Sequence, residues 1–125
     1  MLTEPIPTAF LPTVRPDLSK QFYGNTLGLT LVSEDAYALE FEGNGIVFRI
    51  TTVEKFSPHT FTVLGFTIKE IVSQVKSLSK KGVEFESYDT FEQDDFGIWT
   101  SPNNAKIAWF KDPDGNLLSL TEKFE

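Results

Sequence analysis

The sequence repeats one order of secondary-structure elements, and this constrains the fold more than its composition does. Residues 8–52 and residues 61–124 each predict a strand, a helix and then three more strands. A polar linker over residues 53–60, which contains Pro58, joins the two halves. The repeat lies in element order more than in residue identity. A chain of 125 residues can bury one compact core but hardly two independent ones. We therefore expect one α+β domain over residues 1–125, built from two tandem βαβββ modules.

The first module contains a hairpin whose register follows from its turn. Asn44-Gly45 tolerates the positive φ angles of a type I′ turn, so residues 37–42 should pair with residues 46–50. The core face of this hairpin is then formed by Leu39, Phe41, Phe48 and Ile50. Glu40 faces Arg49 on the second face, where a charged pair needs solvent, a cavity or a ligand beyond it.

A second hairpin near the C-terminus follows the same logic. In Asp112-Pro-Asp-Gly115, proline presets φ at the second turn position and the glycine accepts positive φ. The apolar face then carries Ala108, Phe110, Leu118 and Leu120. Trp109 and Ser119 share the opposite face, so that a large aromatic ring lies beside a small hydroxyl. This arrangement is what the wall of a ligand cavity could look like.

The remaining elements are predicted from periodicity and from helix-end signals. Further strands are expected at residues 8–14, 29–33, 61–68, 83–88 and 96–100, and Pro12 indicates either an edge position or a bulge. A helix should open at Pro16-Asp17 and end near Gly28, with an apolar stripe of Leu18, Phe22 and Leu27. The second helix is expected over residues 69–81, stopped by Gly82, with a stripe of Ile71, Val72, Val75 and Leu78.

Composition excludes several classes of function. The formal charge of −7 opposes binding to a phosphate backbone, so we expect no nucleic-acid partner. No apolar run approaches a membrane span and no signal peptide is evident, so we expect a cytoplasmic protein without membrane contact. The chain has no cysteine and therefore neither disulfides nor thiolate metal sites.

Two motifs carry a resemblance to a known family. The pattern Phe22-Tyr23-x-x-x-Leu27-Gly28-Leu29 and the run from Phe110 to Asn116, in this order within a doubled βαβββ layout, resemble the vicinal oxygen chelate superfamily. That superfamily includes glyoxalase I, extradiol dioxygenases, methylmalonyl-CoA epimerase and the fosfomycin and bleomycin resistance proteins. The resemblance implies curled sheets around a shared cavity and, usually, a homodimer. It implies no single reaction.

The resemblance also implies where metal ligands would lie. Metal-dependent members place a His or Glu on the first and the last strand of each module, and the matching positions here are Ala9, Arg49, Val63 and Ser119. None of these side chains suits a divalent cation, and Arg49 would repel one. We therefore expect no metal and no other cofactor.

The candidate ligand-binding residues are Glu40, Arg49, Trp99, Trp109 and Ser119. Arg49 is either a cavity cation for an anionic ligand or a salt-bridge partner of Glu40, and these readings are compatible. The two tryptophans are either flat walls for a planar ligand or packing residues.

Two other features have both a functional and an ordinary explanation. The acidic residues Glu92, Asp94 and Asp95 either line a cavity mouth or form a solvated loop. His59, the one histidine, is either an ordinary surface residue or, if close to Glu40 or Asp95, half of an acid/base pair.

Two functions fit these residues. One is metal-independent binding of a small molecule, of the sequestration or resistance type, in a cavity lined by arginine and tryptophan. The other is a lyase, isomerase or dioxygenase-like enzyme with a non-standard site, in which Arg49 stabilises an oxyanion and Glu40 or His59 moves a proton. A regulatory domain that keeps the fold without a ligand is a third possibility.

Overall fold

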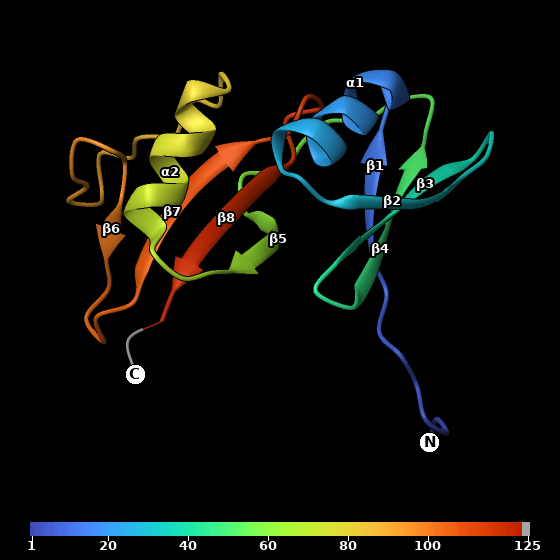
Figure 1. The fold of residues 1–125 in the computed structure, drawn as a ribbon, viewed down its shortest axis with the longest axis horizontal. Coiled ribbons are helices and arrows are strands. Elements are labelled where there is room, and N and C mark those ends of the chain that lie inside the picture. The colour runs from blue at the N-terminus through green and yellow to red at the C-terminus, as the bar shows by residue number, and fades with distance from the viewer. Residues whose placement is uncertain (124–125) are drawn as a thin grey trace. The chain divides into compact units, whose positions relative to one another are not determined.

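The structure is a computed structural model in which residues 1–123 are described (Figure 1). The chain divides into two compact units, Met1–Phe56 and Ser57–Glu125, and each is described by itself. Phe124, the expected end of the second module, lies outside the described residues.

The first unit contains one four-stranded mixed sheet and one helical segment. Its elements are β1 (Ala9–Thr13), α1 (Pro16–Gln21), the π-helix η1 (Phe22–Thr26), β2 (Thr30–Glu34), β3 (Ala38–Gly43) and β4 (Ile46–Thr52). The strand order is β1-β4-β3-β2, in which β1 runs parallel to β4 and the other neighbours are antiparallel. Pro12 lies in an edge strand, as its missing N–H group requires.

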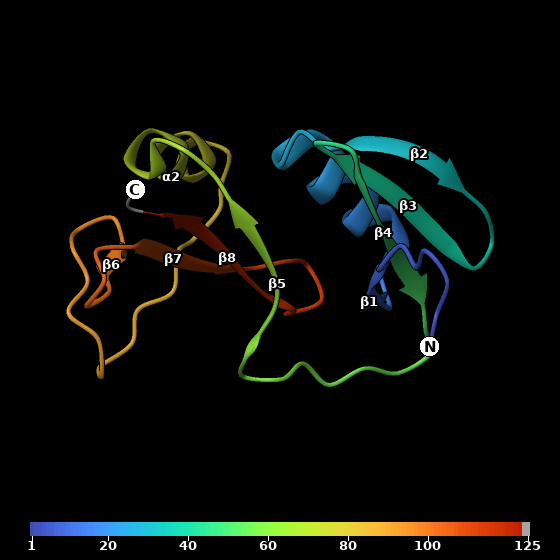
Figure 2. The same cartoon turned by 90° about the horizontal axis from the view of Figure 1, so that it is seen from below.

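The second unit repeats this arrangement with a longer connection after its helix. Its elements are β5 (Thr62–Thr67), α2 (Ile71–Lys80), β6 (Trp99–Thr100), β7 (Lys106–Lys111) and β8 (Leu117–Glu122). The strand order is β5-β8-β7-β6, with β5 parallel to β8. In Figure 2, α2 lies against one face of this sheet. Each sheet is curled but not closed, which confirms the expected α+β fold.

Both predicted hairpin registers are confirmed. Asn44 and Gly45 adopt φ angles of 51° and 82°, and Glu40 pairs with Arg49 across β3 and β4. The four predicted core side chains of this hairpin are buried: Leu39, Phe41, Phe48 and Ile50. Trp109 pairs with Ser119 across β7 and β8, while Ala108, Phe110, Leu118 and Leu120 are buried. The local chemistry of each turn therefore sets which side chains share the second face of its sheet.

The first helical segment buries a different face from the predicted one. Leu18 is 52% exposed, so the predicted apolar stripe is wrong at this position. Phe22 and Leu27 are half-buried, whereas Ser19 and Tyr23 are buried. Ser19 shares a hydrogen bond of 2.8 Å with the Thr13 hydroxyl, which makes a buried serine acceptable. The Tyr23 ring packs 5.8 Å from that of Phe41. From Phe22 the chain forms a π-helical turn, which shifts the positions that point inward.

The second helix is shorter than predicted, and its buried face is narrower. Ile71 and Val75 are buried, whereas Val72 is exposed and does not belong to the apolar stripe. Glu70 has a left-handed φ of 54°, so the helix begins after it and not at residue 69. The Glu122 carboxylate accepts a hydrogen bond of 3.0 Å from the Ile71 amide, and β8 thereby supplies the cap that Glu70 does not. Gly82, with φ of 96°, follows the end of the helix as predicted.

Two predicted strands of the second unit are wrong in extent. Residues 83–88 form no strand, and only Phe85 makes an isolated bridge, to Phe110. The strand predicted at residues 96–100 is reduced to β6, which has two residues. The side chain of Gln93 replaces part of the missing ladder: it accepts from the Tyr88 amide at 2.7 Å and donates to the Glu86 and Gly97 carbonyls at 2.9 and 2.8 Å. This folds residues 84–98 into a loop beside β7.

Candidate functional site

On the second face of the first sheet, Arg49 is held by its neighbours. Its Nη1 lies 3.0 Å from Glu40 Oε1, and the two side chains are 32% and 30% exposed. The Ser33 hydroxyl donates to the same Glu40 oxygen at 2.9 Å. The Arg49 guanidinium also lies 5.9 Å from the centre of the exposed Phe10 ring. The salt-bridge reading of this pair therefore holds, and about a third of each side chain stays open to solvent.

A buried hydroxyl on this same face has no visible partner. Thr51 stands two residues beyond Arg49 along β4 and pairs with Ala38 and Pro12 on the neighbouring strands. Its Oγ1 is buried and makes no hydrogen bond within the described part of the chain. Such a group is stabilised by a water molecule or by a polar ligand atom.

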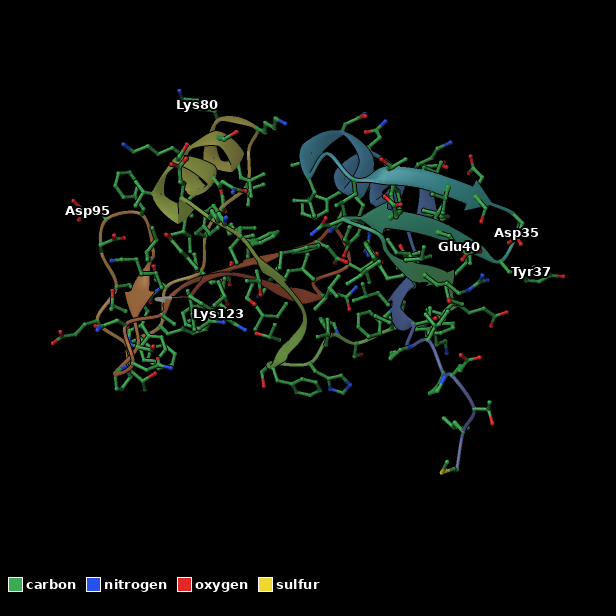
Figure 3. All side chains as sticks on the ribbon, turned by 60° about the horizontal axis from the view of Figure 1, so that its bottom comes forward. Asp35, Tyr37, Glu40, Lys80, Asp95 and Lys123 are labelled. Atoms are coloured by element: carbon green, nitrogen blue, oxygen red, sulfur yellow. The ribbon has the colours of Figure 1, made fainter. Side chains whose placement is uncertain are left out.

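The tip of the β2–β3 hairpin is organised by one carboxylate. Asp35 and Tyr37 lie at this tip, and Glu40 lies farther along β3 (Figure 3). Asp35 Oδ1 accepts hydrogen bonds from the Tyr37 and Ala38 amides at 2.8 and 2.9 Å. These bonds, with Tyr37 first, hold the pKa of Asp35 below its usual value of 3.8, and the charge of Arg49 acts in the same direction.

The second face of the second sheet carries a flat wall beside small residues. Ser119 has Trp109 as its neighbour on β7 and Gly65 as its neighbour on β5. A Cβ atom at Gly65 would lie 2.9 Å from the Ser119 hydroxyl oxygen. Side-chain size in this row therefore increases from Gly65 on β5, through Ser119 on β8, to Trp109 on β7. Helix α2 packs on the other face, against the side where Ala108 and Phe110 are buried.

Four aromatic rings meet at this wall. Trp99 and Trp109 have ring centres 6.1 Å apart. Phe91 lies 4.7 Å from Trp99 and 5.3 Å from Trp109, and its plane is tilted by 7° from that of Trp109. Tyr88 meets Trp109 edge-on at 5.5 Å. The structure thus brings Trp99, Trp109 and Ser119 to one face, as predicted from the hairpin for Trp109 and Ser119.

Tyr88 and Phe91 were missed by sequence reasoning. Both belong to the loop that the hydrogen bonds of Gln93 hold together. Hydrophobic periodicity assigns side chains to a face only within helices and strands, so it does not predict that an aromatic ring in a loop packs against a strand. Burial first, and the nearby charge of Glu86 second, raise the pKa of Tyr88 above its usual value of 10.0. The phenol therefore stays neutral and contributes an apolar edge to the wall.

The loop that carries these rings is strongly acidic. Residues 84–95 contain no lysine or arginine, and their carboxylates are Glu84, Glu86, Asp89, Glu92, Asp94 and Asp95. Lys111 of β7 lies 3.4 Å from Glu86. Asp94 accepts from the Phe96 and Ile98 amides, both at 2.9 Å, and so has a structural role. A hollow of about 610 Å³ opens beside Trp99 and is also lined by Thr90, Glu92 and Asp94.

His59 is exposed and stacks on Phe61, with ring centres 5.0 Å apart. Within residues 1–123 it forms no hydrogen bond or ion pair with Asp95. The pairing of His59 with Glu40 stays a prediction.

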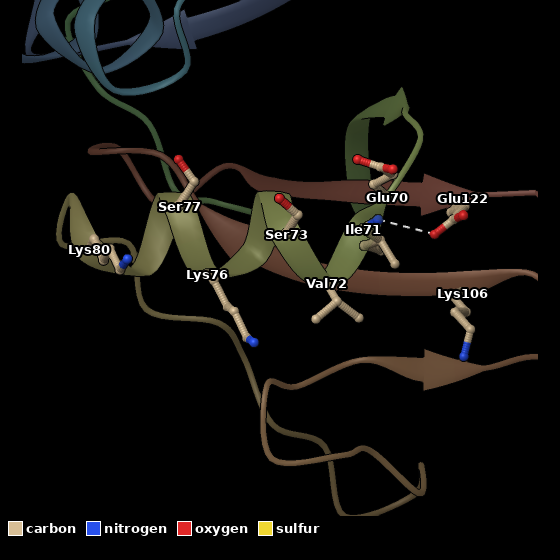
Figure 4. A pocket seen from close by; sticks show the side chains of 9 residues that line it. All are labelled: Glu70, Ile71, Val72, Ser73, Lys76, Ser77, Lys80, Lys106 and Glu122. Carbon is tan, nitrogen blue, oxygen red and sulfur yellow. Dashed lines mark hydrogen bonds between the residues drawn. The ribbon is translucent and has the colours of Figure 1, made fainter.

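A larger hollow lies on the opposite face of the second sheet, beside α2. Figure 4 shows its lining residues, which include Lys76, Lys80, Lys106 and Glu122, around a volume of about 740 Å³. None of the predicted site residues lines it. Glu122 is engaged there as the cap of α2. The hollow therefore contains none of the tryptophan-wall residues, although Lys106 also lines the hollow beside Trp99.

The four positions implied for metal ligands do not fit a metal. Ala9 and Val63 have no donor atom, Ser119 offers a neutral hydroxyl and Arg49 carries positive charge. Across residues 1–123, no three His, Asp or Glu side chains are grouped so that they could hold a metal ion. The donor set therefore agrees with the absence of the usual ligands inferred from the sequence.

The family model described as "Glyoxalase/Bleomycin resistance protein/Dioxygenase superfamily" matches residues 6–120, which is most of the chain. The chain belongs to this superfamily. The resemblance seen in the two sequence motifs is thereby confirmed. A search of curated protein sequences found no match.

Solved structures of the superfamily show the same fold at low sequence identity. A glyoxalase family protein from Enterococcus faecalis is 22% identical, with a TM-score of 0.74, over 98% of this chain and 100% of that one. A glyoxalase/bleomycin resistance protein/dioxygenase from Nocardioides is 22% identical, with a TM-score of 0.73, over 100% and 87%. A lactoylglutathione lyase from Agrobacterium tumefaciens is 14% identical, with a TM-score of 0.74, over 96% and 94%.

These likenesses concern the fold alone, because superfamily members with one architecture catalyse different reactions or none. Over residues 1–123, each helix is too short or too polar to cross a bilayer.

Proposed function

We propose that this superfamily member binds a planar small molecule without a metal ion, and that the ligand lies against Trp109 and Trp99. The observation that carries the proposal is the row of Trp109, Ser119 and Gly65 across one sheet face. A second ring that stacked on Trp109 would meet little side-chain bulk beside it, because Gly65 has no side chain and Ser119 is small and 7% exposed.

The polar groups of this wall would orient the ligand. Within residues 1–123 the Ser119 hydroxyl has no hydrogen-bond partner, and Ser119 is 7% exposed, so a ligand donor or acceptor would meet this hydroxyl at the base of the wall. The acidic loop of residues 84–95 favours a neutral or cationic ring over an anionic one.

Arg49 and Glu40 are proposed as a polar contact site of the first unit, described apart from the tryptophan wall of the second unit. Because Glu40 already neutralises Arg49, a ligand carboxylate or carbonyl would have to compete with Glu40 for the guanidinium. The unpaired Thr51 hydroxyl on the same face supports a polar contact there.

The enzymatic alternative keeps Arg49 as an oxyanion stabiliser. It requires Arg49 to leave Glu40, and it requires Glu40 or His59 to move the proton. The name lactoylglutathione lyase belongs to a relative that shares the fold at 14% identity. We therefore favour binding over turnover.

The test is a thermal-shift screen in buffer containing EDTA. The panel comprises bleomycin, proflavine as a cationic ring and an anthracene carboxylate as an anionic ring. We expect at least one cationic planar compound to raise the midpoint of unfolding, and Trp109→Ala to abolish that shift. Phe61→Ala, which removes an exposed ring from the same unit, is the matched control and should keep the shift.

Turnover is then sought with each compound that binds. Chemical conversion of a bound compound that is lost in Arg49→Ala would favour the enzyme. No shift with any planar compound would contradict the binding proposal. The homodimer expected from the resemblance stays a proposal, which a light-scattering mass of the purified protein tests.

A further inference from the structure

Phe91 lies where a planar ligand would stack. Its ring is nearly parallel to that of Trp109, with an interplanar angle of 7° and a centre-to-centre distance of 5.3 Å. These values are those of an offset aromatic stack. A ring of another molecule would seek the same relation to Trp109. The chain therefore places one of its own side chains in the geometry that the proposed function assigns to a ligand.

Phe91 is also the member of the cluster best able to leave. It is 37% exposed, it lies between the exposed residues Thr90 and Glu92, and its amide makes a long hydrogen bond of 3.2 Å to the Tyr88 carbonyl. By contrast, Trp99 and Trp109 are fixed on strands, and Gln93 ties the base of the loop with three hydrogen bonds. The Phe91 side chain can thus rotate outward while the loop base stays in place.

We propose that Phe91 is an internal competitor for the stacking face of Trp109, displaced when a planar molecule binds. This inference rests on the proposed function and adds its regulation. In the free protein Phe91 covers apolar tryptophan surface that would otherwise be open to water. On binding, the stack of Phe91 on Trp109 is exchanged for a stack of the ligand, so the net affinity is reduced by what the internal stack contributes.

The alternative arrangement makes the opposite prediction. If Phe91 stayed in place as a second wall, its removal would weaken binding, because the ligand would lose a contact. The two roles of Phe91 are therefore distinguished by whether removal of its ring strengthens or weakens ligand binding.

The experiment is a calorimetric titration of proflavine, in EDTA, into wild type, Phe91→Ala and Trp109→Ala. We expect Phe91→Ala to bind about three- to tenfold more tightly than wild type, as loss of an aromatic pair implies. Phe96→Ala is the matched control, because Phe96 is 40% exposed in the same loop but contacts Lys76 instead of the tryptophans. It should bind as wild type does.

Phe91→Leu keeps apolar bulk without a ring and guards against a folding defect of the alanine variant. It should also bind more tightly than wild type. Equal or weaker binding by folded Phe91→Ala and Phe91→Leu would overturn the competitor role. So would the absence of proflavine binding to all folded variants, since a vacated tryptophan face should accept a flat ring.

Failure of the proposed function has a different signature. If proflavine binds wild type and Trp109→Ala equally, the tryptophan wall is not the site at all. If Trp109→Ala loses binding while Phe91→Ala weakens it, the wall stands and only the competitor role of Phe91 fails.

Discussion

Arg49 Nη1 lies 3.0 Å from Glu40 Oε1, on directly paired positions of β4 and β3. The pair is half-buried, so solvent screens much of its attraction, and we expect a coupling energy of about 1 kcal/mol or less. A double-mutant cycle with Glu40→Gln and Arg49→Met, measured by urea unfolding, gives this energy. Ser33→Ala, which removes only the hydroxyl that donates to Glu40, is the control. A coupling of several kcal/mol would mean that the pair is more deeply buried in solution than in this structure.

The close approach of Gly65 and Ser119 leads to a second prediction. Gly65→Ala should lower the free energy of unfolding by about 1 kcal/mol, because its Cβ would lie 2.9 Å from the Ser119 hydroxyl oxygen. Ser119→Ala removes that oxygen, so the double variant should recover most of the loss. Gly43→Ala is the comparison, since its Cβ meets the flexible end of Leu29 at the same 2.9 Å and should cost less. If Gly65→Ala lowered the free energy of unfolding equally in wild type and in Ser119→Ala, the contact would be refuted.

Asp35 should make the first unit sensitive to acid. Hydrogen bonds from the Tyr37 and Ala38 amides lower its folded-state pKa below 3.8. The ionised form therefore stabilises the fold above the unfolded-state pKa, and this contribution is lost as pH falls through the folded-state pKa. NMR titration of the carboxyl carbon should give a midpoint below 3.8. Asp35→Ala should destabilise the protein at neutral pH and progressively less in strong acid. A midpoint at or above the usual value would contradict the capped turn.

The phenol of Tyr88 should lose its proton at a higher pH than an ordinary tyrosine. Burial, and then the charge of Glu86, raise its pKa above 10.0. The neutral phenol therefore contributes stability that is present below the unfolded-state pKa and is lost as pH rises through the folded-state pKa. An ultraviolet titration of wild type minus Tyr88→Phe isolates this group among the three tyrosines. Glu86→Gln should shift the midpoint downward. An unchanged titration midpoint in Glu86→Gln would mean that Glu86 does not act on the Tyr88 phenol.

The parts of the fold that could be predicted are those set by local turn chemistry. Asn44-Gly45 and Gly115 each close a hairpin with positive φ angles, and the pairing of Glu40 with Arg49 and of Trp109 with Ser119 follows from those turns. A period of two along a strand then assigns every side chain to a face. The residues of the second faces were accordingly predicted from the sequence.

The parts that could not be predicted depend on contacts distant in sequence. The Phe91 stack on Trp109 requires the path of residues 84–98, and that path is set by the three hydrogen bonds of the Gln93 side chain. The exposure of Leu18 has another cause, since the buried Ser19 bonds to the Thr13 hydroxyl and Tyr23, four residues later, takes the inward position. Neither effect leaves a periodic signal in the sequence.

Binding of a flat ring at Trp109 without a metal ion is the property proposed here for this protein. Its most direct test is calorimetric titration of proflavine in EDTA into wild type, Trp109→Ala and Phe61→Ala. We expect saturable binding by wild type and by Phe61→Ala, and at least about tenfold weaker binding by Trp109→Ala. Unchanged affinity in Trp109→Ala, or binding that appears only when EDTA is replaced by a divalent metal, would contradict it.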